Sequence, residues 1–171
     1  MLALTLERLP SPIGVMLLLC DQMQQLRALD WEDHEHRLRD LLRRQYGKDV
    51  QIAETGKTSP AGLAMQAYFA GELQAIDAIQ VATGGTEFQS KVWRALRQVP
   101  AGTTLSYAGL AARIGHPAAI RATGAANGAN PISIVVPCHR LVGGDGNLVK
   151  YGGGLHRKTW LLRHEGARLS P

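Results

Sequence analysis

The sequence predicts an α+β fold built from two domains, and three observations lead to this prediction. Short apolar runs separated by turn residues occupy the first third of the chain, as in an antiparallel sheet. The composition shifts around residues 82–85, and the second half carries mainly helical patterns. We therefore expect a small sheet-plus-helix domain over residues 1–83 and a mostly helical domain over residues 84–171.

The first domain is expected to hold a three-stranded antiparallel meander covered by helices. Leucines at helical spacing predict an amphipathic helix over residues 32–46, which Gly47 ends. Its apolar face should cover the meander, and a shorter helix is expected over residues 61–70. The three strands are predicted at residues 2–6, 15–20 and 26–31.

The second domain is expected to begin with a helix over residues 88–99, because apolar residues share one face of it and Pro100 follows. Two short helices, over residues 106–114 and 118–127, are separated by a turn and resemble a helix-turn-helix. The apolar run at residues 130–138 predicts a strand. A last helix is expected over residues 155–164.

The composition is that of a folded globular protein, since 45% of the 171 residues are hydrophobic and 19% are charged. Two cysteines suit neither a disulfide framework nor a metal cage, so we expect a reducing compartment, the cytoplasm. The apolar segment at residues 13–20 is far shorter than the roughly 20 residues that span a bilayer, so no membrane contact is expected. A net charge of +5 permits a polyanionic partner without proving one.

The helix expected over residues 118–127 consists almost entirely of residues with little or no side chain. A helix that reads bases in the major groove normally carries long polar side chains, whereas this helix offers chiefly Arg121. Close docking into a shallow groove would suit such a surface. Tight packing in the protein core explains the same residues more simply, so both readings stay open.

Cys138 and His139 end the apolar run and are the candidate reactive pair. A free thiol with a pKa near 8.5 is largely protonated at neutral pH, so a reactive cysteine needs a base. His139 could serve, but neighbours on a strand point to opposite sides, so a contact requires a bend at Pro137 or a bridging water. For the pair alone, an inert buried cysteine is the simpler reading.

Several motifs together resemble the O6-alkylguanine-DNA alkyltransferases, and the bacterial forms in particular. The strongest is the Pro-Cys-His-Arg sequence at residues 137–140, which Asn130 precedes, and the resemblance covers most of the chain. It implies a ribonuclease H-like first domain and a winged helix-turn-helix-like second domain. The other matching motifs lie at residues 11–14, 68–71, 85–89, 92–93, 106–107, 121–122, 157–158 and 161–166.

The resemblance implies a direct and irreversible transfer of an alkyl group to Cys138, which is consumed in the reaction. His139 would take the thiol proton through a water, and Glu165 would orient the histidine. Asn130 would pin the local backbone so that this geometry holds. Tyr107 would donate a hydrogen bond toward the guanine as it leaves.

The same resemblance implies that the substrate is double-stranded DNA containing O6-alkylguanine, with O4-alkylthymine as a second candidate lesion. A base stacked in a duplex cannot reach a buried cysteine, so the nucleotide is expected to flip out. Arg121 would fill the vacated stack from the minor groove. Close approach to the DNA is expected from small residues of the same helix, which are Ala119, Ala122, Gly124 and Ala126.

Glycines crowd residues 143–154, in a loop that can wrap a ligand or simply turn. By resemblance this loop lines the alkyl pocket, and Gly152 and Lys150 depart from the residues common in the family. The added glycine predicts a looser and wider pocket, which leaves the preferred alkyl group open. The expected substrate-binding residues are Pro137, Tyr151, Gly152 and Gly153.

We expect a single-turnover methyltransferase that is monomeric and needs no cofactor or metal, while cooperative binding to DNA stays open. Cys20 is expected in the core, and His34 and His36 on the surface. One rival is a protein that binds alkylguanine in DNA without reacting, although in such relatives the cysteine is replaced. The other is a Cys-His hydrolase of small esters or peptides, which would turn over and ignore DNA.

Overall fold

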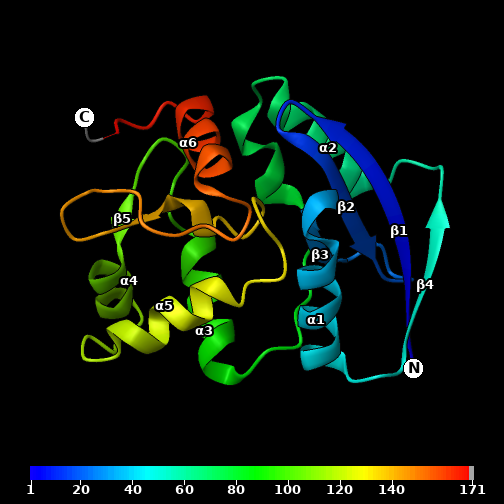
Figure 1. The fold of residues 1–171 in the computed structure, drawn as a ribbon, viewed down its shortest axis with the longest axis horizontal. Coiled ribbons are helices and arrows are strands. Elements are labelled where there is room, and N and C mark those ends of the chain that lie inside the picture. The colour runs from blue at the N-terminus through cyan, green and yellow to red at the C-terminus, as the bar shows by residue number, and fades with distance from the viewer. Residues whose placement is uncertain (170–171) are drawn as a thin grey trace. The chain divides into compact units, whose positions relative to one another are not determined.

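The computed structural model describes residues 1–169, which form two compact units (Figure 1). Unit 1 contains Met1–Gly84 together with Pro131–Val135. Unit 2 contains Gly85–Asn130 and the described residues from Val136 onward. The chain therefore makes a short excursion from unit 2 into unit 1 shortly before Cys138. The sequence prediction, which divides the chain once between residues 83 and 84, does not include this excursion.

Unit 1 is built on a four-stranded sheet with the order β3-β2-β1-β4. The predicted antiparallel meander is confirmed as β1 (Leu2–Ser11), β2 (Gly14–Cys20) and β3 (Leu26–Trp31). β4 (Val50–Thr55) pairs in parallel with the other side of β1 and is absent from the sequence prediction. Its side chains are half-buried or exposed and several are polar, so it lacks the apolar run that marks the other strands.

One face of this sheet is covered by α1 (Glu35–Tyr46), as the leucine spacing predicts (Figure 1). Leu38 and Leu42 of α1 are buried against leucines of β1 and β2. Burying a leucine side chain contributes roughly 1.5–3 kcal/mol, so this stripe holds the helix on the sheet. Unit 1 also contains the 3-10 turn η1 (Glu32–His34), the helix α2 (Pro60–Phe69) and the 3-10 turn η2 (Leu73–Ala78).

Two extended segments add hydrogen bonds to the outer edge of β3. One of them, at residues 80–82, pairs with Leu26. The other is the excursion, in which Leu29 N donates to Pro131 O at 2.9 Å and Ser133 N donates to Leu29 O at 3.0 Å. The excursion therefore extends the sheet of unit 1 through backbone hydrogen bonds.

The prediction of a strand over residues 130–138 is wrong. Within this range a single bridge, between Ile132 and Leu29, has strand geometry, and turns follow it. Ile134 has a φ of +70°, a left-handed conformation that a β-branched side chain rarely adopts. Cys138–Arg140 then forms the 3-10 turn η3. An apolar run indicates that a segment is buried but not which backbone conformation it has. This run is buried throughout and is not a strand.

Unit 2 is mainly helical, as predicted. A two-stranded parallel ladder pairs β5 (Leu105–Ser106) with β6 (Leu141–Val142), and β6 directly follows η3 in the chain. Its helices are α3 (Glu87–Arg97), α4 (Tyr107–Arg113), α5 (Ile120–Gly128) and α6 (Leu155–His164).

The helices α3, α4 and α5 pack against one another. α3 begins at a capping box, in which the side chains of Thr86 and Gln89 each bond the backbone N–H of the other residue. Further along α3, the buried Trp93 donates from Nε1 to Ala126 O of α5 at 2.8 Å. The position of α5 is thus set by a specific hydrogen bond in addition to packing. Within residues 1–169, no helix is long and apolar enough to cross a membrane.

Candidate active site

Cys138 occupies the first position of η3, where the chain has just returned to unit 2. Its backbone N donates to Val136 O at 2.8 Å, which tightens the turn. The side chain is 8% exposed, so a substrate must enter the protein to reach the sulfur. This turn replaces the extended geometry in which Cys138 and His139 would point to opposite sides.

Asn130 holds the two ends of the excursion together. Its side-chain Nδ2 donates to Val136 O at 2.8 Å, and both residues belong to unit 2. The residues between them belong to unit 1, so this bond closes the base of the loop that precedes Cys138. The bond is buried and therefore shielded from competing water. It provides a structural basis for the expected role of Asn130 in pinning the backbone.

His139 and Glu165 form a buried pair. The imidazole Nε2 lies 3.0 Å from Glu165 Oε2, and both side chains are 0% exposed. Because an ionised carboxylate can only accept, Nε2 carries the hydrogen and Nδ1 is the basic nitrogen. Nδ1 is buried and has no hydrogen-bond partner among the described residues. The carboxylate thus orients the imidazole and leaves one nitrogen able to accept a proton.

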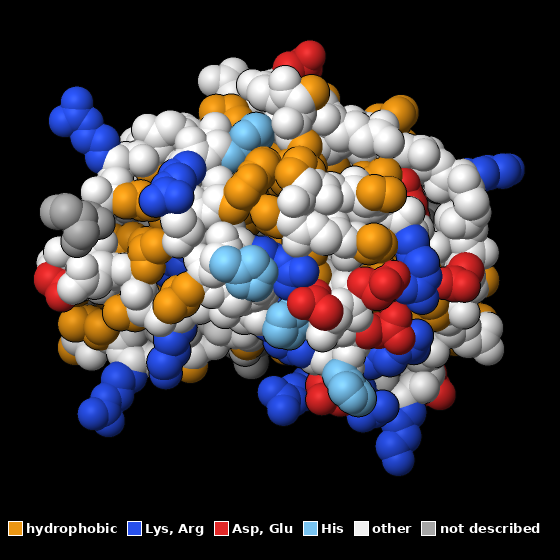
Figure 2. Space-filling model, turned by 45° about the horizontal axis from the view of Figure 1, so that its top comes forward, with side chains coloured by type: hydrophobic (Ala, Val, Ile, Leu, Met, Phe, Trp, Pro, Cys, Tyr) orange, Lys and Arg blue, Asp and Glu red, His pale blue; other side chains and the backbone are white. Residues whose placement is uncertain are grey.

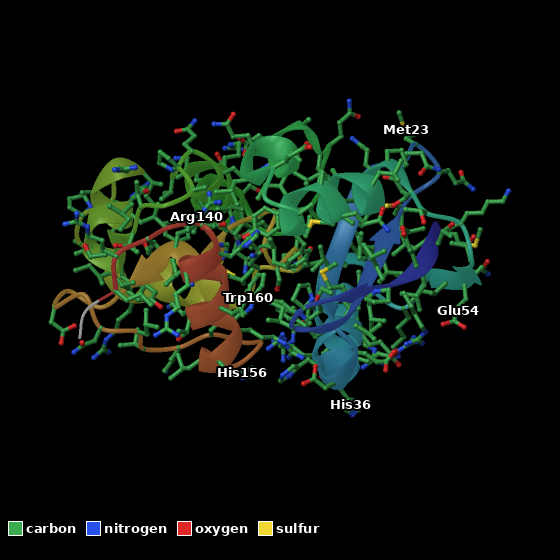
Figure 3. All side chains as sticks on the ribbon, turned by 90° about the horizontal axis from the view of Figure 1, so that it is seen from above. Met23, His36, Glu54, Arg140, His156 and Trp160 are labelled. Atoms are coloured by element: carbon green, nitrogen blue, oxygen red, sulfur yellow. The ribbon has the colours of Figure 1, made fainter. Side chains whose placement is uncertain are left out.

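Arg140, labelled in Figure 3, follows in the same turn. Its side chain binds the same carboxylate. Its Nε donates to Glu165 Oε1 at 2.9 Å and its Nη2 donates to Oε2 at 2.8 Å, which is a bidentate contact. Nη1 donates to Val99 O at 2.6 Å, shortly after the end of α3. The guanidinium charge compensates the buried carboxylate, which can therefore stay ionised without solvent.

Burial and charge set the protonation states of this cluster. Burial lowers the pKa of the His139 imidazole and outweighs the opposing effect of Glu165. Burial alone would raise the pKa of Glu165, but His139 and Arg140 hold it well below its usual range. At neutral pH the cluster contains a neutral imidazole beside an ionised carboxylate, the state that a general base requires.

Tyr107 begins α4 directly after Ser106, whose side chain caps the helix. Its ring lies against α5, because a Cβ atom at Gly124 would be 3.7 Å from Tyr107 Cδ1. Burial raises the pKa of the phenol, and the charge of the Cys138 thiolate adds to this effect. Tyr107 is therefore a protonated donor near the sulfur, on the side of α5.

Lys158 of α6 is a buried cation to which the sequence analysis assigns no role. It is 0% exposed, and its Nζ donates to Lys150 O at 3.0 Å in the glycine-rich loop. Burial lowers the pKa of the ammonium to about 8, whereas the charge of Cys138 acts to raise it. Lys158 thus holds the loop and places a positive charge near the sulfur.

The glycine-rich loop passes next to His139. The rings of Tyr151 and His139 meet edge to face with their centroids 6.5 Å apart. Gly153 O accepts a hydrogen bond from Arg157 Nη1 at 3.1 Å, while Gly152 is exposed. The expected substrate-binding residues Tyr151, Gly152 and Gly153 therefore form one segment beside the imidazole, and the buried Pro137 directly precedes Cys138.

The exposed side of α5 carries Arg121 and Ala122, while Ala119 and Gly124 are partly exposed. Ala126 is different, because its side chain is 3% exposed and its carbonyl binds Trp93. The expectation that Ala126 contacts DNA is therefore wrong, since its side chain belongs to the core of unit 2. Ala125, which the sequence analysis does not name, is exposed in its place.

Comparison with known proteins assigns the family. Residues 87–167 match the family described as "6-O-methylguanine DNA methyltransferase, DNA binding domain". The methylated-DNA–protein-cysteine methyltransferase of Salmonella typhimurium is 49% identical over 168 residues, which cover 97% of this chain and 98% of the relative. This chain belongs to the methylated-DNA–protein-cysteine methyltransferase family. The enzyme of that name from Mycobacterium leprae is 50% identical over 114 residues, 67% of this chain and 68% of the relative.

Solved structures of similar proteins confirm the α+β fold. The O6-methylguanine methyltransferase of Mycobacterium tuberculosis superposes with a TM-score of 0.74 at 36% identity, covering 97% of this chain and 93% of that chain. The M. tuberculosis OGT in complex with DNA gives a TM-score of 0.77 at 36% identity, with 96% and 92% covered. The likeness therefore extends over both units of this methyltransferase.

Two charged residues of this methyltransferase site, Arg140 and Lys158, are missing from the sequence-based set. Both stand in sequence motifs that support the resemblance, but nothing in a motif says that a cation is buried. For Lys158 a signal exists, because it shares a helix face with the buried Leu161 and Leu162 at a spacing of three and four residues. A cation on an apolar face indicates a buried charge with a specific partner.

Proposed function

We propose that this chain repairs alkylated DNA by moving the alkyl group from O6 of a guanine to Sγ of Cys138. The observation that carries the proposal is the buried chain from Arg140 through Glu165 to His139, in the same turn as the cysteine. A carboxylate that fixes a neutral imidazole next to a thiol is an arrangement for making a thiolate. An inert core cysteine would need none of these groups.

In the proposed reaction the Cys138 thiol gives its proton, through a water, to Nδ1 of His139. The thiolate then attacks the alkyl carbon in line with the bond to O6 of guanine. The bond from sulfur to carbon forms as the bond from carbon to oxygen breaks, and its electron pair stays on the guanine. Tyr107 donates a hydrogen bond or proton toward that base, which offsets the developing negative charge. Glu165 stabilises the imidazolium that results.

The product is a thioether at Cys138, and thioethers resist both hydrolysis and reduction. Each molecule is therefore expected to react once and not to be regenerated. The charge of Lys158 supports the thiolate before attack, and its bond to Lys150 keeps the loop in place around the alkyl group. We propose that Gly152 widens this pocket and that Lys150 adds a DNA contact, so alkyl groups larger than methyl are accepted.

We propose that α4 and α5 act as a winged helix-turn-helix, with α5 in the minor groove of the duplex. The small exposed residues Ala122 and Ala125 allow a close approach, and Arg121 replaces the flipped nucleotide in the stack. Flipping costs a few kcal/mol, which contacts to the backbone and to the extruded base must offset. We further propose a ribonuclease H-like arrangement for unit 1, a monomeric protein and a cytoplasmic location.

The test is to incubate the purified protein with a duplex carrying O6-methylguanine and to weigh the intact protein. We expect the mass of one methyl group, never more than one per molecule, and peptide mapping should place it on Cys138. Cys138→Ala should bind the duplex and gain no mass, whereas Cys20→Ala should react as the parent does. Firm binding without added mass would support a non-catalytic recognition protein instead, and an unmodified duplex serves as the control.

A further inference from the structure

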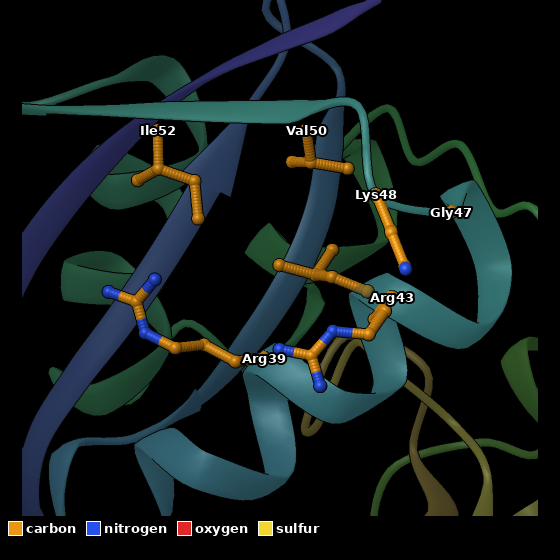
Figure 4. A pocket seen from close by; sticks show the side chains of 7 residues that line it. Arg39, Arg43, Gly47, Lys48, Val50 and Ile52 are labelled. Atoms are coloured by element: carbon orange, nitrogen blue, oxygen red, sulfur yellow. The ribbon is translucent and has the colours of Figure 1, made fainter.

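A basic groove lies in unit 1, at the edge of the sheet and outside the proposed active site (Figure 4). It has a volume of about 330 Å³ and runs between the second half of α1 and the edge strand β4. Its apolar lining consists of Leu42 from α1 and of Val50 and Ile52 from β4. Three cationic side chains also line it, Arg39 and Arg43 from α1 and Lys48 from the turn after it. Nothing in the proposed reaction uses these residues.

The cations of the basic groove are only weakly neutralised by the protein. Arg39 Nε lies 3.4 Å from Glu35 Oε2 and Arg43 Nη1 lies 3.4 Å from Asp40 Oδ1, well beyond the roughly 2.8 Å of a strong charge-assisted bond. Their side chains are 49% and 64% exposed, and such surface pairs contribute little. Among the described residues that line the groove, none is acidic.

Arg8, another arginine of unit 1, differs from the arginines of the basic groove because carboxylates surround it. Arg8 donates to Glu54 at 2.7 Å and to Glu32 at 2.8 Å, and a third carboxylate, that of Glu35, lies 3.5 Å away. Figure 2 shows acidic side chains gathered beside Lys and Arg on one part of its face. Arg8 is therefore saturated with acidic partners, whereas the basic groove keeps its positive charge available for a ligand.

The helix dipole accounts for only part of the arrangement. A cation in the last turn of a helix is favourable, and Arg43 stands in the last turn of α1. Lys48 lies beyond the helix, after Gly47 has turned the chain with a φ of +76°. Arg39 lies two turns before the end. Convergence of all three on one apolar floor is better explained by a ligand that is anionic and partly apolar.

We propose that the basic groove binds the sugar-phosphate backbone of duplex DNA. Phosphates alternate with deoxyribose rings along a strand, which suits cations around an apolar floor. The inference rests on the proposed function in one respect, because that function supplies DNA as the polyanion that the protein meets. The groove would provide phosphate contacts from unit 1, and these contacts are independent of base sequence.

The test compares salt dependence of binding to an undamaged, fluorescein-labelled duplex by anisotropy between 50 and 200 mM NaCl. The groove variant is Arg39→Gln, Arg43→Gln and Lys48→Gln together, and the matched control removes the same charge as Arg44→Gln, Lys57→Gln and Lys91→Gln. Each phosphate contact contributes about 0.9 to the slope of log K against log salt. We expect the groove variant, which removes three contacts, to lose about 2.7 from the slope and to bind at least about tenfold more weakly at 50 mM NaCl. The control should lose clearly less.

Equal losses in both triple variants would overturn the proposal, since they would report net charge alone. No loss in the groove variant would overturn it as well and would leave an acidic protein segment as the occupant to test. A charge-keeping variant, Arg39→Lys with Arg43→Lys, should retain the slope. Thermal unfolding within a few degrees of the parent shows that the fold is intact.

Transfer from the free base O6-benzylguanine separates this proposal from the proposed function. That reaction needs no duplex, so the groove variant should alkylate Cys138 at the parental rate. A parent protein that gains no methyl group from the O6-methylguanine duplex, while the groove substitutions still reduce the salt dependence of its binding, would refute the proposed function and support the groove. Loss of the free-base reaction in the groove variant alone would show that the substitutions disturb unit 2 and would overturn the proposal.

Discussion

At the scale of single residues, one carboxylate serves two neighbours, since Glu165 binds both His139 and Arg140. The consequence is that the imidazole and the guanidinium are fixed by the same group. Changing Glu165 therefore has two separable effects, on the reaction and on stability. Both can be measured with the isosteric amide, which keeps an acceptor for His139 and removes the charge.

We expect Glu165→Gln to slow alkylation of Cys138 by about 100-fold, because the neutral amide no longer stabilises an imidazolium. The parental rate should stay constant as the pH falls through 6.5, since burial lowers the pKa of His139 below that value. Single-turnover rates with O6-benzylguanine between pH 5 and 8 would show this. A parental rate that halves at pH 6.5 would contradict the burial argument.

Glu165 also contributes to acid stability. Its pKa is lower in the folded protein than in the unfolded chain, so its contribution is fully present above the ordinary value of about 4.3 and is lost at lower pH. The parent should therefore lose its stability advantage over Glu165→Gln as the pH falls below about 4. Urea unfolding at pH 7 and pH 3 measures both differences, and a constant difference would refute the assignment.

Lys158 destabilises the folded protein at neutral pH, because burial disfavours its charged form, whereas Glu165 stabilises it. Its pKa is about 8 in the folded protein and about 10.4 when unfolded, so the folded state binds fewer protons between these values. The free energy of unfolding should rise between pH 8 and pH 10, because the buried amine is neutral in the folded state while the unfolded chain still binds the proton. Lys158→Met removes the group and should lack this rise. Denaturant titrations of both proteins across that range decide the point.

Ile134 is strained where Ile132 is not, and both are fully buried. Glycine tolerates the left-handed conformation, so Ile134→Gly relieves about 1–3 kcal/mol of backbone strain. Ile132→Gly relieves none. We expect Ile134→Gly to destabilise the protein by at least about 1 kcal/mol less than Ile132→Gly. Equal losses in chemical unfolding would mean that the turn at Ile134 stores no strain.

At the scale of elements, the bond from Trp93 to Ala126 O fixes α5 on α3. Trp93→Phe removes the indole donor from this carbonyl, which keeps only the longer bond from Ala129 N at 3.2 Å, and this loss costs about 0.5–1.5 kcal/mol. Because the displaced element carries Arg121, binding to a duplex should weaken while the free-base reaction of Cys138 persists. Trp160→Phe on α6 serves as the matched control. Equal loss of both activities would mean that α5 and the reactive centre are not separable.

The elements also show what sequence reasoning can and cannot reach. The helices α1 and α3 follow from helical periodicity, because each buries one regular face. The strands β1 to β3 follow from short apolar runs between turn residues, and β2 and β3 are buried on both faces. β4 escapes that logic, since it is an edge strand with mixed side chains. The apolar run before Cys138 leads to a wrong strand prediction, because a segment buried on all sides has the same apolar residues in a turn as in a strand.

The site follows the same division. The sequence by itself offers Cys138 and His139 as a candidate pair. Glu165 is identifiable only through resemblance to a family, because side-chain pairs distant in the chain have no local signature. The geometry adds what the motif leaves unsaid, namely that Arg140 neutralises Glu165 and that Lys158 holds the loop. The exclusion of Ala126 from the DNA-facing side also depends on the actual phase of α5, which a run of small residues does not fix.

At the scale of the whole molecule, the two units are not two consecutive pieces of chain. Pro131–Val135 is encoded in the second half but completes the edge of β3 in unit 1. Residues 1–84 expressed alone would leave that edge open, and an open edge invites pairing between molecules. We expect this fragment to aggregate at concentrations where the full chain remains monodisperse in gel filtration. A soluble, monomeric fragment would show that the excursion is dispensable to unit 1.

This threading also limits how such proteins can recombine. A crossover at residue 84 between two related genes exchanges the second half together with the residues that hydrogen-bond Leu29 of the first. Each chimera then inherits a sheet edge from one parent and its complement from the other. Viable hybrids are therefore expected where the two parents agree around Leu29 and Ile132. Identical alkyl-acceptor sites alone would not be enough.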